Sequence, residues 1–178
     1  MAVRPAIAAV PYPDPQAVPG LAEVYAEVGA IGRPVLNLYR IMGHSVDGLR
    51  AYIGLSHFVR DRSSLPPRLR ELAILQTGLS LSCEYEVHHH VQAARAAGLN
   101  EAEIQAIVDG RKAGFSEQEL AVLSYARGAA EAHAASADTV ASLRRLLTLQ
   151  QISDLAVTVG MYHMIAAIVL PLQVDIDA

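Results

Sequence analysis

The sequence is poor in aromatic residues and nearly free of cysteine. Its 178 residues include no tryptophan, two phenylalanines and a single cysteine, although hydrophobic residues make up 52% of the chain. One cysteine excludes an internal disulfide, and no secretory signature is present, so we expect a cytoplasmic protein. A composition rich in alanine and aliphatic residues, with few rings, favours closely packed helices.

An excess of positive charge is also missing. The formal net charge is −4 and the isoelectric point is near 5.9, so no nucleic acid or anionic membrane is expected as a partner. No alternating strand pattern or hairpin signal interrupts the helical periodicities, and the chain is therefore predicted to be all-α. Its length suits one compact domain with a substantial core.

Proline is concentrated at the start of the chain. Residues 1–19 contain five of the nine prolines, which predicts an extended arm followed by a single all-helical domain over residues 20–178. Capping signals and breakers predict the helices within that domain. The expected ranges are 21–28, 37–42, 48–59, 68–79, 82–97, 100–109, 116–134, 138–147 and a final helix from residue 148.

The final helix contains a long apolar run. Residues 155–172 carry no charge over 18 positions, which approaches the length of a membrane span. However, His163 lies within the run, Asp154 and Pro171 border it, and no basic cluster flanks it. We therefore expect a buried helix or a subunit-interface helix rather than a span.

Polar chemistry is concentrated around the only thiol, Cys83. With Ser82 as N-cap, Cys83 would lie in the first turn of a helix, and Glu86 and His90 would follow at positions i+3 and i+7 on the same face. The helix N-terminus should lower the pKa of the thiol, whereas nearby carboxylates should raise it. Of the three consecutive histidines, only His90 shares this face.

Glu71 lies on the inward face of the preceding predicted helix, together with Leu75. Burial against leucines should raise the pKa of its carboxyl group, and a carboxylate beside an imidazole can relay protons. A metal site is an alternative, because Glu86 and His90 at i and i+4 could chelate a divalent ion with Glu71 or Cys83 as third ligand. That spacing is common by chance and no HExxH motif is present, so we predict neither a metal nor a cofactor.

The spacing of these four residues resembles a known pattern. Glu71, eleven residues, Cys83, two residues, Glu86, three residues and His90 is similar to the core of the carboxymuconolactone decarboxylase and alkylhydroperoxidase D-like superfamily. In its peroxidase branch a second cysteine stands where Glu86 does, so the chain resembles the single-cysteine, decarboxylase-like branch. The resemblance implies an alkylhydroperoxidase D-like helical bundle, with the C-terminal half carrying the core motif, and self-association as a trimer or hexamer.

Three functions follow from this resemblance and from the residues. The first is a decarboxylase-like lyase that transfers protons to a small carboxylated or lactone-type organic acid. In it His90 and Glu71 handle protons, Glu86 orients His90, and Cys83 lines the pocket or acts as an acid. The second is a single-cysteine thiol peroxidase or reductase with Cys83 as nucleophile. The third is a non-catalytic helical oligomer that binds a small ligand.

Overall fold

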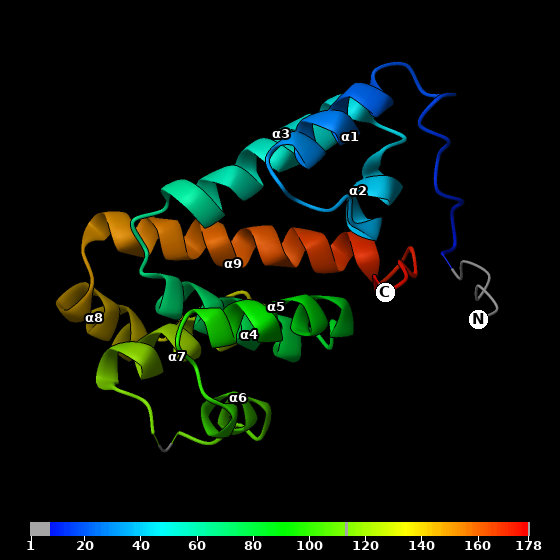
Figure 1. Cartoon of the computed structure of the whole chain (residues 1–178). Helices are drawn as coiled ribbons and strands as arrows, with labels where there is room; N and C mark the ends of the chain where they lie inside the picture. The colour runs from blue at the N-terminus through cyan, green and yellow to red at the C-terminus, as the bar shows by residue number, and fades with distance from the viewer. Residues whose placement is uncertain (1–7, 113, 178) are drawn as a thin grey trace. The chain divides into compact units, whose positions relative to one another are not determined.

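The computed structural model describes residues 8–112 and 114–177, and these residues form helices and no strand (Figure 1). The predicted all-α fold is confirmed. The elements are α1 (Leu21–Ala30), α2 (Asn37–Met42), α3 (Val46–His57), a π-helical turn (Phe58–Arg62), α4 (Pro67–Ser80), α5 (Glu84–Ala96), α6 (Glu101–Val108), α7 (Glu117–Ala132), α8 (Ala137–Leu146) and α9 (Leu149–Val169).

Capping boxes begin α6 and α7, as the sequence predicts. The amide of Glu103 donates to the Asn100 side chain at 3.0 Å, and the Glu103 carboxylate accepts from the Asn100 amide at 2.8 Å. Ser116 and Glu119 make the same reciprocal pair at 3.3 and 2.7 Å. Each box satisfies amide groups that the first turn of a helix leaves without partners.

The turn between α4 and α5 differs from the prediction, because Ser82 is not an N-cap. Its φ of 54° is left-handed, and the amide groups of Ser82 and Cys83 donate to the carbonyls of Leu79 and Gly78 at 3.0 and 2.8 Å. This pattern is a Schellman motif, with Ser82 in the position that glycine usually occupies. Cys83 is then the N-cap of α5 rather than a residue of its first turn.

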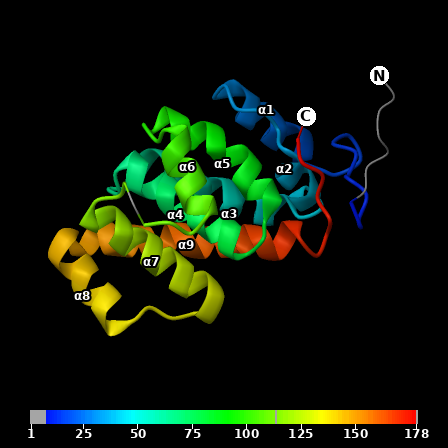
Figure 2. The ribbon, with the colours of Figure 1, turned by 90° about the horizontal axis from the view of Figure 1, so that it is seen from below.

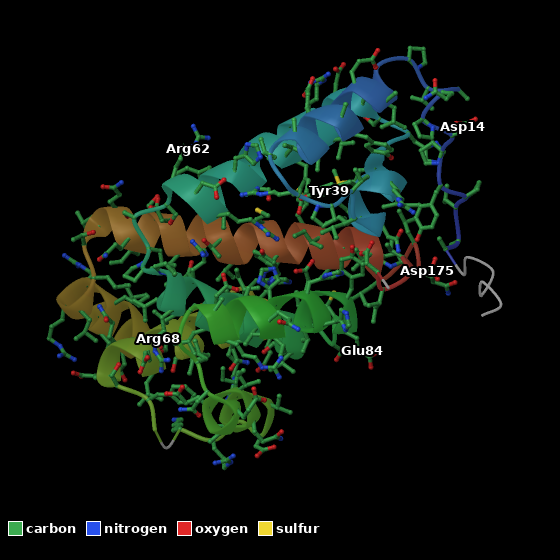
Figure 3. The ribbon with its side chains drawn as sticks, viewed as in Figure 1. Asp14, Tyr39, Arg62, Arg68, Glu84 and Asp175 are labelled. Atoms are coloured by element: carbon green, nitrogen blue, oxygen red, sulfur yellow. The ribbon has the colours of Figure 1, made fainter. Side chains whose placement is uncertain are left out.

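The described residues divide into two compact units. The first comprises residues 8–58 and 167–177 and contains α1, α2 and α3, with α3 packed against the other two helices. Tyr39 of α2, labelled in Figure 3, meets Tyr52 of α3 edge to face, with ring centroids 5.8 Å apart. Arg50 of α3 pairs with Glu27 of α1 at 2.7 Å.

The predicted arm covers residues 1–19, of which residues 1–7 lie outside the described part of the chain. From residue 8 to residue 19 the chain forms turns and irregular structure without a helix. The hydroxyl of Tyr12 donates to the carboxylate of Asp175 at 3.0 Å. This part of the arm is therefore attached to the C-terminal tail of the same unit.

The second unit, Val59–Ala166, is built around α4. Helix α4 packs against α5, α6 and α7, and α7 packs against α8 (Figure 2). Every residue from Glu71 to Gly78 is buried, so α4 has no solvent-facing side over two turns. Any charged group in this stretch must find its partners inside the protein.

Helix α9 contains the apolar run discussed above. It is the one helix among the described residues that is long and apolar enough to cross a membrane, and half of its most apolar window is buried inside the structure. Core helices of proteins outside membranes also meet this criterion of length and composition, so the helix is weak support for a membrane span.

Candidate functional site

Helices α4 and α5 bring together three of the predicted site residues inside the second unit. Glu71, Glu86 and His90 are only 3–4% exposed. Gly78 permits the close approach, because a Cβ at this position would lie 3.3 Å from both the Glu86 Cβ and the Val87 Cγ2. The inward-facing arrangement predicted for these side chains is therefore present, and the glycine in α4 makes room for it.

His90 is the centre of a hydrogen-bonded chain. Its Nδ1 lies 2.7 Å from the Glu71 Oε2, and its Nε2 lies 2.8 Å from the Tyr162 hydroxyl, which α9 contributes. The Glu86 Oε2 is 3.6 Å from the same Nε2, beyond hydrogen-bonding distance. Glu71, rather than Glu86 as predicted, is thus the carboxylate that orients the imidazole.

The carboxyl group of Glu71 has a lowered pKa, which corrects the expected increase. Burial acts to raise the pKa, but the hydrogen bond and charge of His90 and the guanidinium of Arg70 outweigh it. The Arg70 Nε donates to the Glu71 Oε1 at 3.1 Å. Burial was foreseen from the sequence, whereas the two basic partners that stabilise the carboxylate were not.

Glu86 has the opposite character. Burial raises its pKa to about 8, with the Glu71 carboxylate contributing in the same direction and the Arg60 guanidinium opposing it. Burial also lowers the pKa of His90, against the influence of Glu71. Near neutral pH the cluster therefore holds an ionised Glu71, a neutral His90 and a protonated Glu86. In this state His90 donates its Nδ1 proton to Glu71 and accepts the Tyr162 hydroxyl at Nε2.

Cys83 lies in the turn just before Glu84, the first residue of α5, which Figure 3 labels at the start of that helix. The thiol is completely buried, and burial together with the charge of Glu86 raises its pKa. The backbone amides of Glu86 and Tyr85 at the helix N-terminus act in the other direction. The two opposing influences predicted for this thiol are both present, and burial determines the outcome.

Three neighbours of the cluster, Tyr162, Arg60 and Arg70, are not among the four predicted site residues. Tyr162 is 72 residues from His90 in the chain, and no spacing rule links them. Arg60 belongs to the π-helical turn Phe58–Arg62, and its carbonyl accepts a hydrogen bond from Arg70 at 3.0 Å. A π-turn has no clear sequence signature, although such turns are frequent at functional sites.

The metal alternative finds no support in the described residues, where no group of three His, Cys, Asp or Glu side chains is placed to hold an ion. Both ring nitrogens of His90 already have partners in Glu71 and Tyr162.

Of the three consecutive histidines, only His90 was predicted to share the face of Cys83 and Glu86. In the structure His88 is exposed and His90 is buried.

The chain resembles several solved structures. A peroxidase-related protein from Ralstonia eutropha JMP134 with an alkylhydroperoxidase AhpD core is 18% identical, with a TM-score of 0.81 over 98% of this chain and 94% of that one. A peroxidase-related protein from Silicibacter sp. TM1040 is 20% identical, with a TM-score of 0.81 over 96% and 92% of the two chains. The debrominase Bmp8, in a Cys-to-Ala variant bound to 2,3,4-tribromopyrrole, is 18% identical, with a TM-score of 0.78 over 94% and 90%.

At these identities the likeness establishes the fold alone. Residues 47–128 in addition match the model of the carboxymuconolactone decarboxylase family. The fold and this match confirm the predicted resemblance to the carboxymuconolactone decarboxylase and alkylhydroperoxidase D-like superfamily. None of the curated proteins matches it.

Proposed function

We propose that this protein is a decarboxylase-like enzyme that transfers protons to a small carboxylated or lactone-type organic acid, without a cofactor. The observation that carries the proposal is the chain from Glu71 through His90 to Tyr162, with contacts of 2.7 and 2.8 Å. A carboxylate that orients an imidazole, which in turn contacts an acidic hydroxyl, is an arrangement suited to general acid–base catalysis.

The protonation states support the same function. A general acid must hold a proton near the working pH, and the pKa of Glu86 at about 8 keeps its carboxyl group protonated there. An acceptor must be neutral at the same pH, and the lowered pKa of His90 provides one. Two carboxyl groups on the same helix pair thus have separate roles, Glu71 as the orienting anion and Glu86 as the proton store.

The chemistry balances with these groups alone. When the bond to the carboxylate carbon breaks, CO₂ leaves and its electron pair enters the conjugated lactone carbonyl as a dienolate. Glu86 donates its proton to carbon as the electron pair returns, and His90 returns a proton from water to Glu86, whose Oε2 lies 3.6 Å from the His90 Nε2. A dry site favours the first step, because a charged carboxylate loses stabilising water as it becomes neutral CO₂.

The first test is CO₂ release from carboxymuconolactone by the wild-type chain and by His90→Gln. We expect His90→Gln to lower kcat by roughly 10² to 10⁴-fold, the usual contribution of a general acid–base group. His88→Gln is the matched control, since His88 is an exposed histidine on the same helix, and it should leave the rate unchanged. Circular dichroism and thermal unfolding check that both variants fold.

Full activity in His90→Gln would rule out the proposal. The thiol peroxidase would replace it if the chain reduced hydroperoxides with an added thiol, and if that activity were lost in Cys83→Ser but kept in His90→Gln. Its balance is simple: the thiolate takes one oxygen to become a sulfenic acid, an alcohol leaves, and the added thiol reduces the sulfenic acid. The buried, raised-pKa thiol makes this the second candidate.

We also propose self-association as a trimer or hexamer, in keeping with the superfamily resemblance. Three apolar side chains of α9 are exposed within the second unit, namely Leu149, Val157 and Met164, with Leu149 exposed to 76%. Exposed apolar side chains along one helix are typical of a subunit contact. Size-exclusion chromatography with light scattering measures the assembly directly.

A further inference from the structure

The second unit contains a cavity that is separate from the His90 cluster. Its volume is about 350 Å³, and its walls come from α4, α6, α7 and the start of α8. None of Glu71, Cys83, Glu86, His90 or Tyr162 lines it. A cavity of this size is at the lower end of the range that small-molecule sites occupy.

Positive charge gathers at this cavity, although the chain as a whole is acidic. Arg111, Lys112 and Arg127 line it together with one carboxylate, Glu131, whereas the formal net charge of the chain is −4. Three cations against one anion leave an excess of two positive charges. A concave wall with such an excess attracts and retains anions.

Arg127 is a cation of this wall whose described partner is neutral. In the part of the chain that the structure describes, its Nη2 donates to the amide oxygen of Gln76 at 3.3 Å rather than to a carboxylate. The nearby Glu131 instead accepts from the Ser80 hydroxyl at 3.0 Å, and Ser80 also accepts from the Gln76 amide at 3.0 Å. A neutral partner orients the guanidinium and leaves its charge available for a ligand.

Arg111 is a second cation of the cavity, and its ion pair does not prevent it from binding an anion. Arg111 pairs with Asp109 at 3.0 Å, and both side chains are at least 40% exposed. An exposed pair of this kind is weak and exchanges readily for a better anion. Ser136 and Thr139, at the N-terminal end of the ten-residue helix α8, also line the cavity, and the positive end of the helix dipole adds to the field.

The remaining wall is apolar. Ile107, Leu120 and Leu123 face the same cavity, and Ile107 and Leu123 are only 4% and 8% exposed. An inorganic ion would make no contact with these apolar side chains, whereas a short aliphatic or unsaturated chain would pack against them. The lining therefore suits a molecule with an anionic head and a small apolar body.

We propose that this cavity binds a small organic anion, a carboxylate or a phosphate monoester, with its head on Arg127 and Arg111 and its body against Ile107, Leu120 and Leu123. This site is independent of the function proposed for the His90 cluster, because the two share no residue. Carboxylates and phosphates both accept bidentate hydrogen bonds from arginine, and the experiment distinguishes them.

The experiment is calorimetric titration of the full chain with three probes of equal length, hexanoate, hexyl phosphate and hexanol. We expect at least one of the two anions to bind and hexanol not to bind. The anion with the lower Kd identifies the head group. Because a hydrogen bond to a charged group is lost, Arg127→Gln should weaken the binding of that anion by about tenfold or more, and Arg111→Gln should weaken it less.

Arg144→Gln is the charge-matched control, because Arg144 is an exposed residue of α8 that does not line the cavity; it should leave Kd within about twofold. Arg127→Lys keeps the charge but loses the bidentate contact, so its affinity should lie between those of the wild type and of Arg127→Gln. The proposal is overturned if neither anion binds at concentrations up to about 10 mM, if hexanol binds as tightly, or if Arg144→Gln weakens binding as much as Arg127→Gln does. The proposal does not require any of these variants to lose CO₂ release. Its failure can therefore be distinguished from failure of the function proposed for the His90 cluster.

Discussion

Helix α4 carries two charge clusters, one partly exposed and one buried, and they differ in what their protons can do. Near its start, Arg68 (labelled in Figure 3) donates to Glu103 at 2.7 Å, to Glu119 at 2.6 Å and to the carbonyl of Gly98 at 2.7 Å. Three residues further along, Glu71 binds His90. Both clusters hold a base and two carboxyl groups, but the side chain of Arg68 is 30% exposed whereas the His90 cluster is almost fully buried.

The pKa values move in opposite senses in the two clusters. Hydrogen bonds that Arg68 donates to the two carboxylates raise its pKa, and its guanidinium in turn lowers that of Glu103. Around His90, burial raises the pKa of Glu86 to about 8 and lowers that of the imidazole. The first cluster holds fixed charges and stabilises the fold. The second brings its protons within reach of neutral pH, which catalysis requires and stability does not.

The largest change in stability is expected from removing the fixed charge of the first cluster. Arg68→Ala leaves the buried carboxylate of Glu119 without its ion-pair partner, which should lower the free energy of unfolding by about 2 to 3 kcal/mol, below the value for a fully enclosed pair because Arg68 is partly exposed. Urea unfolding measures the loss, with Arg144→Ala as an exposed control that should change stability little. If the two clusters act independently, the pH profile of CO₂ release should be the same in Arg68→Ala as in the wild-type chain. A shifted profile would mean that the two clusters are coupled.

A smaller effect is expected from Glu86, and it should depend on pH. Its pKa is about 8 in the folded chain against an ordinary value of 4.5, so the folded state holds this proton more tightly than the unfolded state does. The resulting stability is complete below pH 4.5 and is lost as the pH rises to 8. From pH 6.5 to 8, where the titration of His90 interferes least, the loss should total roughly 2 kcal/mol.

Unfolding measured at several pH values tests this directly. Glu86→Gln should remove the decline between pH 6.5 and 8, because glutamine does not titrate. Glu84→Gln, at an exposed position two residues earlier, is the matched control and should keep it. The same decline in both variants would show that Glu86 is ionised at neutral pH, and the contrast between the two clusters would then disappear.

The smallest effect is expected at the turn that connects the second cluster to its cysteine. Ser82 has a φ of 54°, which costs a non-glycine residue about 1 kcal/mol. Ser82→Gly should therefore raise the free energy of unfolding by up to about 1 kcal/mol, less the extra chain entropy of glycine. Ser82→Ala keeps the strain and is the control. Both variants lack the serine hydroxyl, so a lower stability in Ser82→Gly than in Ser82→Ala would contradict the predicted relief of backbone strain.

The sequence predicted those features that depend on neighbours along the chain. Asn100 with Glu103 and Ser116 with Glu119 form the predicted capping boxes, and the common face of Glu86 and His90 follows from helical periodicity. Ser82 was assigned the wrong role because a serine before a helix is a good N-cap by local preference. The preceding helix instead ends there, with the Gly78 carbonyl accepting the Cys83 amide.

What the sequence could not predict depends on contacts between distant segments. The burial of Glu71 was foreseen, but the sign of its pKa shift depends on where the Arg70 and His90 side chains point. Tyr162 reaches His90 only because α9 packs beside α5 in the second unit. Likewise, Arg111 follows α6 and Arg127 lies within α7, and only the packing of the helices brings both to one cavity.

Because the only thiol is completely buried, the rate at which it is alkylated reports local opening of the structure. No reagent can reach Cys83 in the closed structure, so alkylation requires the α4–α5 turn to open first. With fast reclosing, the ratio of the observed alkylation rate to that of a free thiol gives the population of the open state. One cysteine in a chain with no other therefore allows the opening of the turn beside the His90 cluster to be timed at a single atom, without any label or engineered residue.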